Sequence, residues 1–191
     1  MEIEVKILNI EPETLRQRLR AAGCQRLRRE FQRNRMYDYP DQRLYQQEDG
    51  SYIRIREQRD LDSGVRSNLL TLKKTLSRSG YKIADETETE VSDADSCEQF
   101  LLKLGFVRTR IDEKRRETWT LPGLHFEIDH WAGLPPYLEI EATSEAEVER
   151  GLALLGYSLA DTTTLNLREV LALYQVESDS LCFADVEPEL I

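Results

Sequence analysis

The first residues of the chain alternate strictly between charged and apolar side chains. In the run EIEVKI, residues 2–7, the charged residues are Glu2, Glu4 and Lys6. Successive side chains of a β-strand point to opposite faces, so this run predicts a strand with one charged face and one apolar face. A single strand of this kind is typical of a sheet with one face in water. Repetition of the pattern in other strands would instead indicate a charged surface that the whole sheet shares.

The pattern does recur, and the charged face of each strand carries charge of mainly one sign. The acidic sets are Glu2/Glu4, Glu86/Glu88/Glu90, Glu127/Asp129 and Glu139/Glu141. The basic sets are Arg54/Arg56, Lys73 and Lys114/Arg116. An ordinary solvated face would mix its charges with Ser, Thr, Asn and Gln and would not sort them by sign. If the apolar faces pack outward under helices, the charged faces line a shared interior.

Four segments have the apolar spacing of short amphipathic helices: residues 11–24, 93–106, 144–157 and 165–176. Between them lie period-two runs which, with the first run, make about eight strands, and turn signals such as Asp49-Gly50 separate several of these. Short links favour antiparallel pairing. We therefore predict an α+β fold, in which an eight-stranded antiparallel β-barrel with a charged interior has its helices packed outside. The predicted domain spans residues 1–176, and an acidic tail follows at 177–191.

The composition limits the class of protein. The chain has 191 residues, of which 40% are hydrophobic and 32% charged, and its net charge is -10. That acidic total argues against nucleic acid as a partner, because a nucleic-acid binder needs a net basic face. No apolar run is long enough to span a membrane, and the acidic start is not that of a signal peptide. Three cysteines without metal-type spacing favour a cytoplasmic location. The sequence leaves the oligomeric state open, as monomer or homodimer.

An interior lined by ionised groups needs water, counter-charges, a metal ion or a polyanion, because unpaired buried charges are costly. Carboxylates two residues apart on a strand are about 7 Å apart at the backbone, so their side chains can converge on one hard cation. Mg²⁺ is typically held by one or two carboxylates together with the phosphates of a substrate. Arginine and lysine bind the phosphate oxygens. The pattern thus favours a polar tunnel that holds a ligand over a solvated sheet face.

The ordered set of motifs resembles the CYTH, or triphosphate tunnel metalloenzyme, superfamily. This superfamily includes thiamine triphosphatases, inorganic tripolyphosphatases, RNA triphosphatases and class IV adenylyl cyclases. The resemblance covers about residues 1–175 and rests on these runs: Glu2-Ile3-Glu4-Val5-Lys6, Tyr37-Asp38-Tyr39-Pro40-Asp41, Ile53-Arg54-Ile55-Arg56, Leu70-Thr71-Leu72-Lys73, Glu88-Thr89-Glu90, Lys114-Arg115-Arg116, Ile128-Asp129 and Leu138-Glu139-Ile140-Glu141.

The resemblance implies a tunnel that binds a triphosphate together with Mg²⁺ or Mn²⁺. The residues that it places around the metal are Glu2, Glu4, Asp129, Glu139 and Glu141. Those that it assigns to phosphate binding and catalysis are Lys6, Arg54, Arg56, Lys73, Lys114 and Arg116. Glu88 and Glu90 match the acidic strand of the substrate site, where they would orient basic residues or a water. Arg33 and Arg35 are interpreted as exposed, His125 and His130 as structural, and Arg168 is left without a role.

The resulting hypothesis is metal-dependent hydrolysis of a triphosphate, either inorganic tripolyphosphate or an organic triphosphate such as thiamine triphosphate or a nucleotide. The alternative enzyme is a class IV adenylyl cyclase that converts ATP to cyclic AMP and pyrophosphate. An alternative of another class is a non-catalytic module that binds polyphosphate or a nucleotide. The Glu-x-Glu pairs at both ends of the fold disfavour a simple binder, because acids beside phosphates are useful only with a metal.

Overall fold

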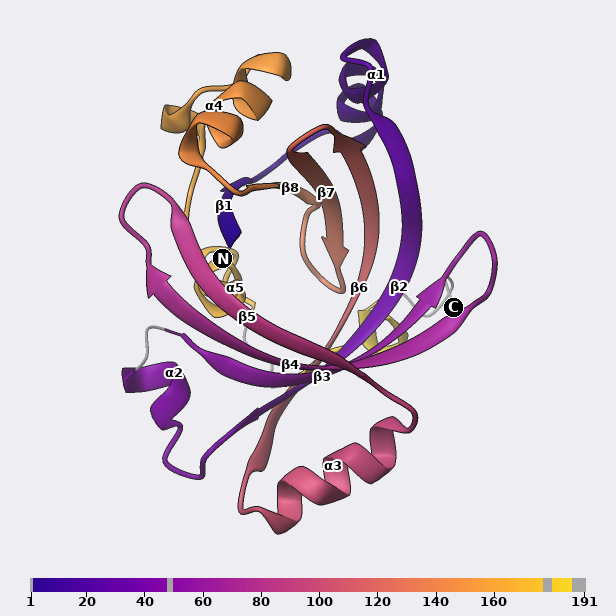
Figure 1. Cartoon of the computed structure of the whole chain (residues 1–191), viewed down its shortest axis with the longest axis vertical. Helices are drawn as coiled ribbons and strands as arrows, with labels where there is room; N and C mark the ends of the chain where they lie inside the picture. The colour runs from indigo at the N-terminus through magenta and orange to yellow at the C-terminus, as the bar shows by residue number, and fades with distance from the viewer. Residues whose placement is uncertain (1, 48–49, 177–179, 187–191) are drawn as a thin grey trace.

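The computed structural model describes residues 2–47, 50–176 and 180–186. Eight strands close into an antiparallel β-barrel, so the predicted α+β barrel fold is confirmed (Figure 1). The strands are β1 (Glu2–Ile7), β2 (Gln25–Asp38), β3 (Tyr52–Asp60), β4 (Arg66–Ser77), β5 (Lys82–Val91), β6 (Val107–Leu121), β7 (Leu124–Trp131) and β8 (Tyr137–Ala142). Their order is β2-β3-β4-β5-β1-β8-β7-β6, and pairing of β6 with β2 closes the ring. A two-residue strand, β9 (Ser180–Leu181), adds in parallel to β6.

The four predicted helices all form. They are α1 (Pro12–Ala21), α3 (Ala94–Lys103), α4 (Glu145–Leu154) and α5 (Leu167–Leu173). The side chains of Asp93 and Ser144 cap the N-termini of α3 and α4. The short elements α2 (Arg43–Gln47), η1 (Leu159–Asp161) and α6 (Phe183–Val186) were not predicted. None of the helices in the described ranges is long and apolar enough to cross a membrane.

The main core lies between the outer faces of β1, β7 and β8 and the two helices α1 and α4, on one side of the barrel (Figure 1). Val5 and Ile140 on the strands and Leu19 on α1 are fully buried there. Gly151 lets α4 approach closely, because a Cβ at this position would lie 3.1 Å from the side chains of Ile140 and Leu124. The apolar half of each alternating strand therefore packs outward, as predicted.

On the opposite side of the barrel, α3 packs against β3, β4 and β6 (Figure 1). Arg35 of β2 points outward there and is bound by three carboxylates, with contacts of 2.9 Å to Glu57 and 2.7 Å to both Asp95 and Glu98. Only 11% of its side chain is exposed, so the interpretation of Arg35 as exposed is wrong. Helix α3 covers it and supplies two of these carboxylates, Asp95 and Glu98. Arg33 does keep 44% of its side chain in solvent.

A second apolar cluster joins α5 and residues 181–183 to β7 and β8. Leu181 and Phe183 are only 2% exposed and pack against this cluster, and the backbone N–H of Phe183 donates to Glu113. Residues 180–186 of the predicted tail are therefore a packed extension of the barrel. Residues 177–179 and 187–191 of the tail lie outside the described residues.

Candidate functional site

The inward faces of the strands surround one cavity of about 270 Å³ inside the barrel. Every predicted site residue lines this cavity except Asp129, which is fully buried behind it, and Glu90, which is exposed beyond its rim. The charged lining also includes six residues that were not among the predicted site residues: Arg28, Arg78, Lys82, Glu86, Asp112 and Glu127. The alternation of the sequence thus becomes a charged interior, enclosed by strands whose apolar faces point away from it.

Most charges of opposite sign lie on opposite walls of the cavity; the exceptions include Lys6 and Lys82 on the acidic side and Asp112 on the basic side. In the strand order, β5, β1, β8 and β7 are consecutive, and they carry most of the acidic side chains. The basic strands β6, β3 and β4 form the other part of the ring, and β2 contributes Asn34 and Met36 between β6 and β3. This arrangement gives a ligand an acidic wall and a basic wall at the same time.

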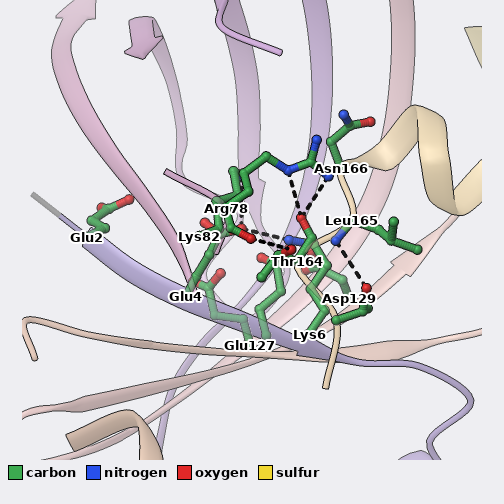
Figure 2. Close-up of polar contacts among 12 residues, drawn as sticks. Glu2, Glu4, Lys6, Arg78, Lys82, Glu127, Asp129, Thr164, Leu165 and Asn166 are labelled. Carbon is green, nitrogen blue, oxygen red and sulfur yellow. Dashed lines mark hydrogen bonds and ion pairs between the residues drawn. The ribbon is translucent and has the colours of Figure 1, made fainter. Parts of the chain in front are cut away.

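On the acidic wall, Glu4 is held by three lysines. Its Oε1 atom lies 2.6 Å from Lys6 and 3.0 Å from Lys82, and its Oε2 atom lies 3.5 Å from Lys73. Burial alone would raise the pKa of the Glu4 carboxyl, but these lysines outweigh it and lower that pKa well below its usual value. Figure 2 shows Glu4, Lys6 and Lys82 in one group of side chains inside the barrel. Glu2 lies nearer the rim and contacts Lys73 at 3.1 Å.

Asp129 is bound to the basic residues of the neighbouring strand β6. Its Oδ1 accepts from Arg116 Nε at 2.6 Å, and its Oδ2 accepts from Arg116 Nη2 at 2.6 Å and Lys114 Nζ at 2.7 Å. Asp129 is 0% exposed and has its cross-strand partner in Arg116. Both of its oxygen atoms are therefore engaged in orienting cations.

The basic wall contains two cations that lack sufficient counter-charge. Arg54 pairs with Glu86 at 3.1 Å, whereas no described carboxylate lies within ion-pair distance of Arg56, whose Nε donates to Asn34. Burial, together with Arg54 and Arg116, lowers the pKa of Arg56 to about 10. Burial and Arg116 also lower the pKa of Lys114 to about 8, despite its contact with Asp129. An anion bound beside these groups would raise both pKa values again, because it stabilises the charged forms.

The acidic wall has the opposite imbalance at Glu127 and Glu141, which cluster with Glu139, whose own pKa, despite burial, is lowered by Lys6 and Arg116. One carboxylate oxygen from each lies within 4.8 Å of the other two. Burial, followed by repulsion from Glu127, raises the pKa of Glu141 well above its usual value, and Glu141 has no ion pair with a described residue. Burial also raises the pKa of Glu127. Clustered carboxylate oxygens are the ligands that Mg²⁺ and Mn²⁺ prefer, so this donor set fits such a cation.

One end of the cavity is covered by the segment before α5. The backbones of Lys6 and Thr163 form a pair of hydrogen bonds, and Asn166 and Leu167 line the cavity. Arg78 donates from Nε and Nη2 to the carbonyl oxygen of Thr164 and pairs with Glu169 of α5 (Figure 2). These contacts fix α5 against the strands β1 and β4.

The remaining charged or titratable residues that the sequence singled out lie away from the cavity. The guanidinium of Arg168 stacks on Tyr45 at 4.3 Å and lines a separate surface hollow. His125 is exposed, and the ring of His130 packs against Phe183 on the outside of the barrel. None of the three reaches the carboxylate cluster.

Comparison with known proteins gives a family and a fold. A sequence model described as the CYTH domain matches residues 1–164. A search of curated protein sequences finds no significant match. Among solved structures, PH1819 protein from Pyrococcus horikoshii OT3 superposes with a TM-score of 0.75 and 24% identity, covering 92% of this chain and 99% of its own.

Two further solved structures share the barrel. An adenylate cyclase candidate from Vibrio parahaemolyticus has a TM-score of 0.73 and 16% identity, covering 90% of this chain and 97% of its own. The adenylyl cyclase candidate HpAC1 from Hippeastrum, for which a dominant triphosphatase activity is described, has a TM-score of 0.64 and 19% identity. The match covers 91% of this chain and 96% of HpAC1. At these identities the structures support the fold alone.

Proposed function

Because this chain belongs to the CYTH domain family, we propose that it is a metal-dependent triphosphatase that cleaves a phosphoanhydride bond inside its barrel. One observation carries the proposal: two opposite charge imbalances face the same cavity. Arg56 and Lys114 have depressed pKa values on one wall, and Glu141 has a raised pKa on the other. A polyphosphate and a divalent cation, bound together, would correct both imbalances.

The basic residues of the cavity bind the phosphates in this proposal. Arg54, Arg56 and Lys73 project from β3 and β4, and Lys114 and Arg116 project from β6, so cationic groups approach a ligand from two directions. Arginine offers paired N–H donors that match phosphate oxygens, and fixed cations stabilise the charge that develops as the bond breaks. Catalysis would then consist of positioning and electrostatic stabilisation, as in other phosphoryl transfers.

Carboxylates of β1, β7 and β8 would hold Mg²⁺ or Mn²⁺. When bound, such a cation neutralises charge on the phosphate oxygens and lowers the pKa of a water ligand. Lys6, Lys73 and Lys82 keep Glu4 ionised, so this carboxylate stays available to a cation near neutral pH. Glu86 and Glu88 orient Arg54 through contacts of 3.1 and 3.5 Å.

The test is a series of incubations with Mg²⁺ or Mn²⁺ in which tripolyphosphate, thiamine triphosphate and ATP are offered in turn. Phosphate, pyrophosphate and cyclic AMP are measured separately. We expect phosphate from tripolyphosphate or a simple organic triphosphate, little cyclic AMP from ATP, and no activity with a chelator. An Arg56→Gln variant should lose the activity. An Arg35→Gln variant is the matched control, because that arginine lies on the outer face of the barrel.

The same series decides between the proposal and its alternatives. Cyclisation of ATP needs a pocket that holds adenine and ribose so that the 3′-hydroxyl lies in line with the α-phosphate. Cyclic AMP and pyrophosphate as main products, with tripolyphosphate left intact, would make the protein a class IV adenylyl cyclase. Tight binding of tripolyphosphate without any cleavage would make it a non-catalytic polyphosphate-binding module.

A further inference from the structure

Two acidic residues on β7, Glu127 and Asp129, point toward the interior, but only one of them faces the cavity. Glu127 lines the cavity and is 5% exposed, whereas Asp129 is fully buried and absent from the lining. The resemblance to the CYTH family assigns the metal-ligand role on this strand to Asp129. The geometry of the described residues indicates different roles for Glu127 and Asp129.

Asp129 lies outside both the cavity lining and the carboxylate cluster, and its two oxygen atoms already bind basic side chains. Arg116 and Lys114 approach its two oxygens with three contacts of 2.6 to 2.7 Å. Charge-assisted contacts of this length are strong, and breaking them would leave two cations unpaired in the interior. The arrangement suits a residue that fixes the direction of Arg116 and Lys114 toward a bound phosphate.

Glu127 supplies the third carboxylate of the cluster that it forms with Glu139 and Glu141. It is the direct cross-strand partner of Glu139, and its carboxylate lies within 4.8 Å of those of both Glu139 and Glu141. Like charges that face each other across a sheet are destabilising. Its contact with Arg116 supplies a single positive charge, which Arg116 also shares with Asp129 and Glu139. A divalent cation would compensate the cluster more completely.

A second observation at the same place is an oxygen without a partner. Thr118 is the direct cross-strand neighbour of Glu127, is 1% exposed, and its Oγ1 atom makes no hydrogen bond with a described residue. The Oε2 atom of Glu127 beside it has Arg116 as its ion-pair partner, so the unpartnered oxygen here is that of Thr118. Buried polar atoms normally have partners. A hydrated cation would supply them, because its water ligands donate hydrogen bonds to such oxygens.

We infer that Glu127, rather than Asp129, joins Glu139 and Glu141 as the β7 ligand of the divalent cation, and that Asp129 positions Arg116 and Lys114. This inference builds on the proposed function, since it concerns the cation of that site. It separates two roles that the sequence pattern Glu127-Ile128-Asp129 places on one face of one strand.

The test measures Mn²⁺ binding without any substrate, from the paramagnetic resonance signal of the free ion. The variants are Glu127→Gln and Asp129→Asn, which remove one negative charge each at nearly constant volume, and Asp85→Asn, an exposed control on β5. We expect the Mn²⁺ dissociation constant to rise about tenfold or more in Glu127→Gln. In Asp129→Asn it should rise less than about threefold, and in Asp85→Asn it should not change.

A second readout is tripolyphosphate binding at saturating Mn²⁺, measured by calorimetry. Asp129→Asn should weaken that binding about tenfold, because Arg116 and Lys114 lose the group that orients them. Should Glu127→Gln fail to fold, Glu127→Asp keeps the charge on a shorter side chain, and its Mn²⁺ affinity should still fall severalfold.

An Asp129→Asn variant that loses Mn²⁺ affinity as strongly as Glu127→Gln would overturn the inference. So would wild-type affinity in both Glu127 variants, or a wild-type protein that binds no Mn²⁺. If the expected order of affinities holds while no triphosphate is cleaved, the inference stands and the proposed hydrolysis fails.

Discussion

Replacing Arg56 by glutamine should stabilise the substrate-free protein, although it removes a charged side chain from the site. The reason is the absence of a counter-charge. The pKa of Arg56 is lowered to about 10 by burial and by Arg54 and Arg116. One pKa unit corresponds to 1.36 kcal/mol. The lowered pKa therefore means that the charged form of Arg56 destabilises the folded protein by about 3 kcal/mol. Solvent screens part of this effect, and the variant also loses the packing of the arginine side chain. We therefore expect the free energy of unfolding to rise by about 1–2 kcal/mol in Arg56→Gln.

The matched control is Arg35→Gln on the outer face of the same barrel. Arg35 contacts Glu57, Asp95 and Glu98 at 2.9, 2.7 and 2.7 Å, so its removal leaves carboxylates without their cation. We expect that variant to lose about 1–3 kcal/mol of stability. The same substitution should thus raise the free energy of unfolding at Arg56 and lower it at Arg35.

The assay is urea unfolding at neutral pH in phosphate-free buffer with a chelator, followed by the same titration with tripolyphosphate and Mg²⁺. Ligand at 100 times its dissociation constant should stabilise the wild type by about 2.7 kcal/mol, and Arg56→Gln much less. If Arg56→Gln loses stability without ligand, as the control does, Arg56 has adequate counter-charge and the reasoning is refuted.

Three further predictions concern other parts of the molecule. Affinity for tripolyphosphate should fall as the pH rises through about 8, because Lys114 then loses its proton, and calorimetry across this range should show no such step in Lys114→Met. The double variant Glu2→Gln/Glu4→Gln should lose cation-dependent activity. It should also unfold at lower urea, because the pKa of Glu4 is lowered by its lysines and its charged form stabilises the fold; unchanged activity would contradict a metal role for β1. Gly151→Ala should cost about 1 kcal/mol in thermal unfolding, since the added Cβ would press on Ile140; an increase in stability would show that the contact relaxes freely.

The alternation of side chains in the sequence was enough to predict the barrel and the inward face of each strand. Val5 and Ile140 pack outward, and Glu4 and Arg116 line the cavity, because a period of two allows no other choice once helices cover one face. The alternation does not say how far along the barrel each side chain lies. That position depends on the tilt and stagger of the strands.

This limit explains the residues that were missed or misplaced. Glu86, Glu88 and Glu90 share one face of β5, yet Glu86 contacts Arg54 and Lys73 while Glu90 lies beyond the cavity rim. Lys82 at the start of the same strand reaches Glu4 because the register pairs these two residues, which no local pattern reveals. Arg78 lies after the end of β4, where strand periodicity no longer applies.

The exposed halves of the two longest strands escaped prediction for a different reason. The runs at 25–29 and 107–110 are rich in arginine, lack apolar alternation and resemble loops in composition. They are strands because residues 25–29 pair with residues 117–120, and residues 107–110 pair with residues 36–38, in the long β2–β6 ladder that closes the barrel. Pairing between segments so far apart in the chain supplies the hydrogen bonds that local propensity would not secure.

The position of β1 in the ring has a consequence for how the protein is made. Of the eight barrel strands this one is synthesised first, but one of its two neighbours, β8, is synthesised last: Val5 pairs with Ile140. Contacts between such distant segments form slowly, because a long loop must close before they are gained. A nascent chain that has not reached residue 137 holds Glu2, Glu4 and Lys6 without Glu139 and Glu141 beside them. The acidic wall is therefore completed only when β8 has been synthesised and has paired with β1.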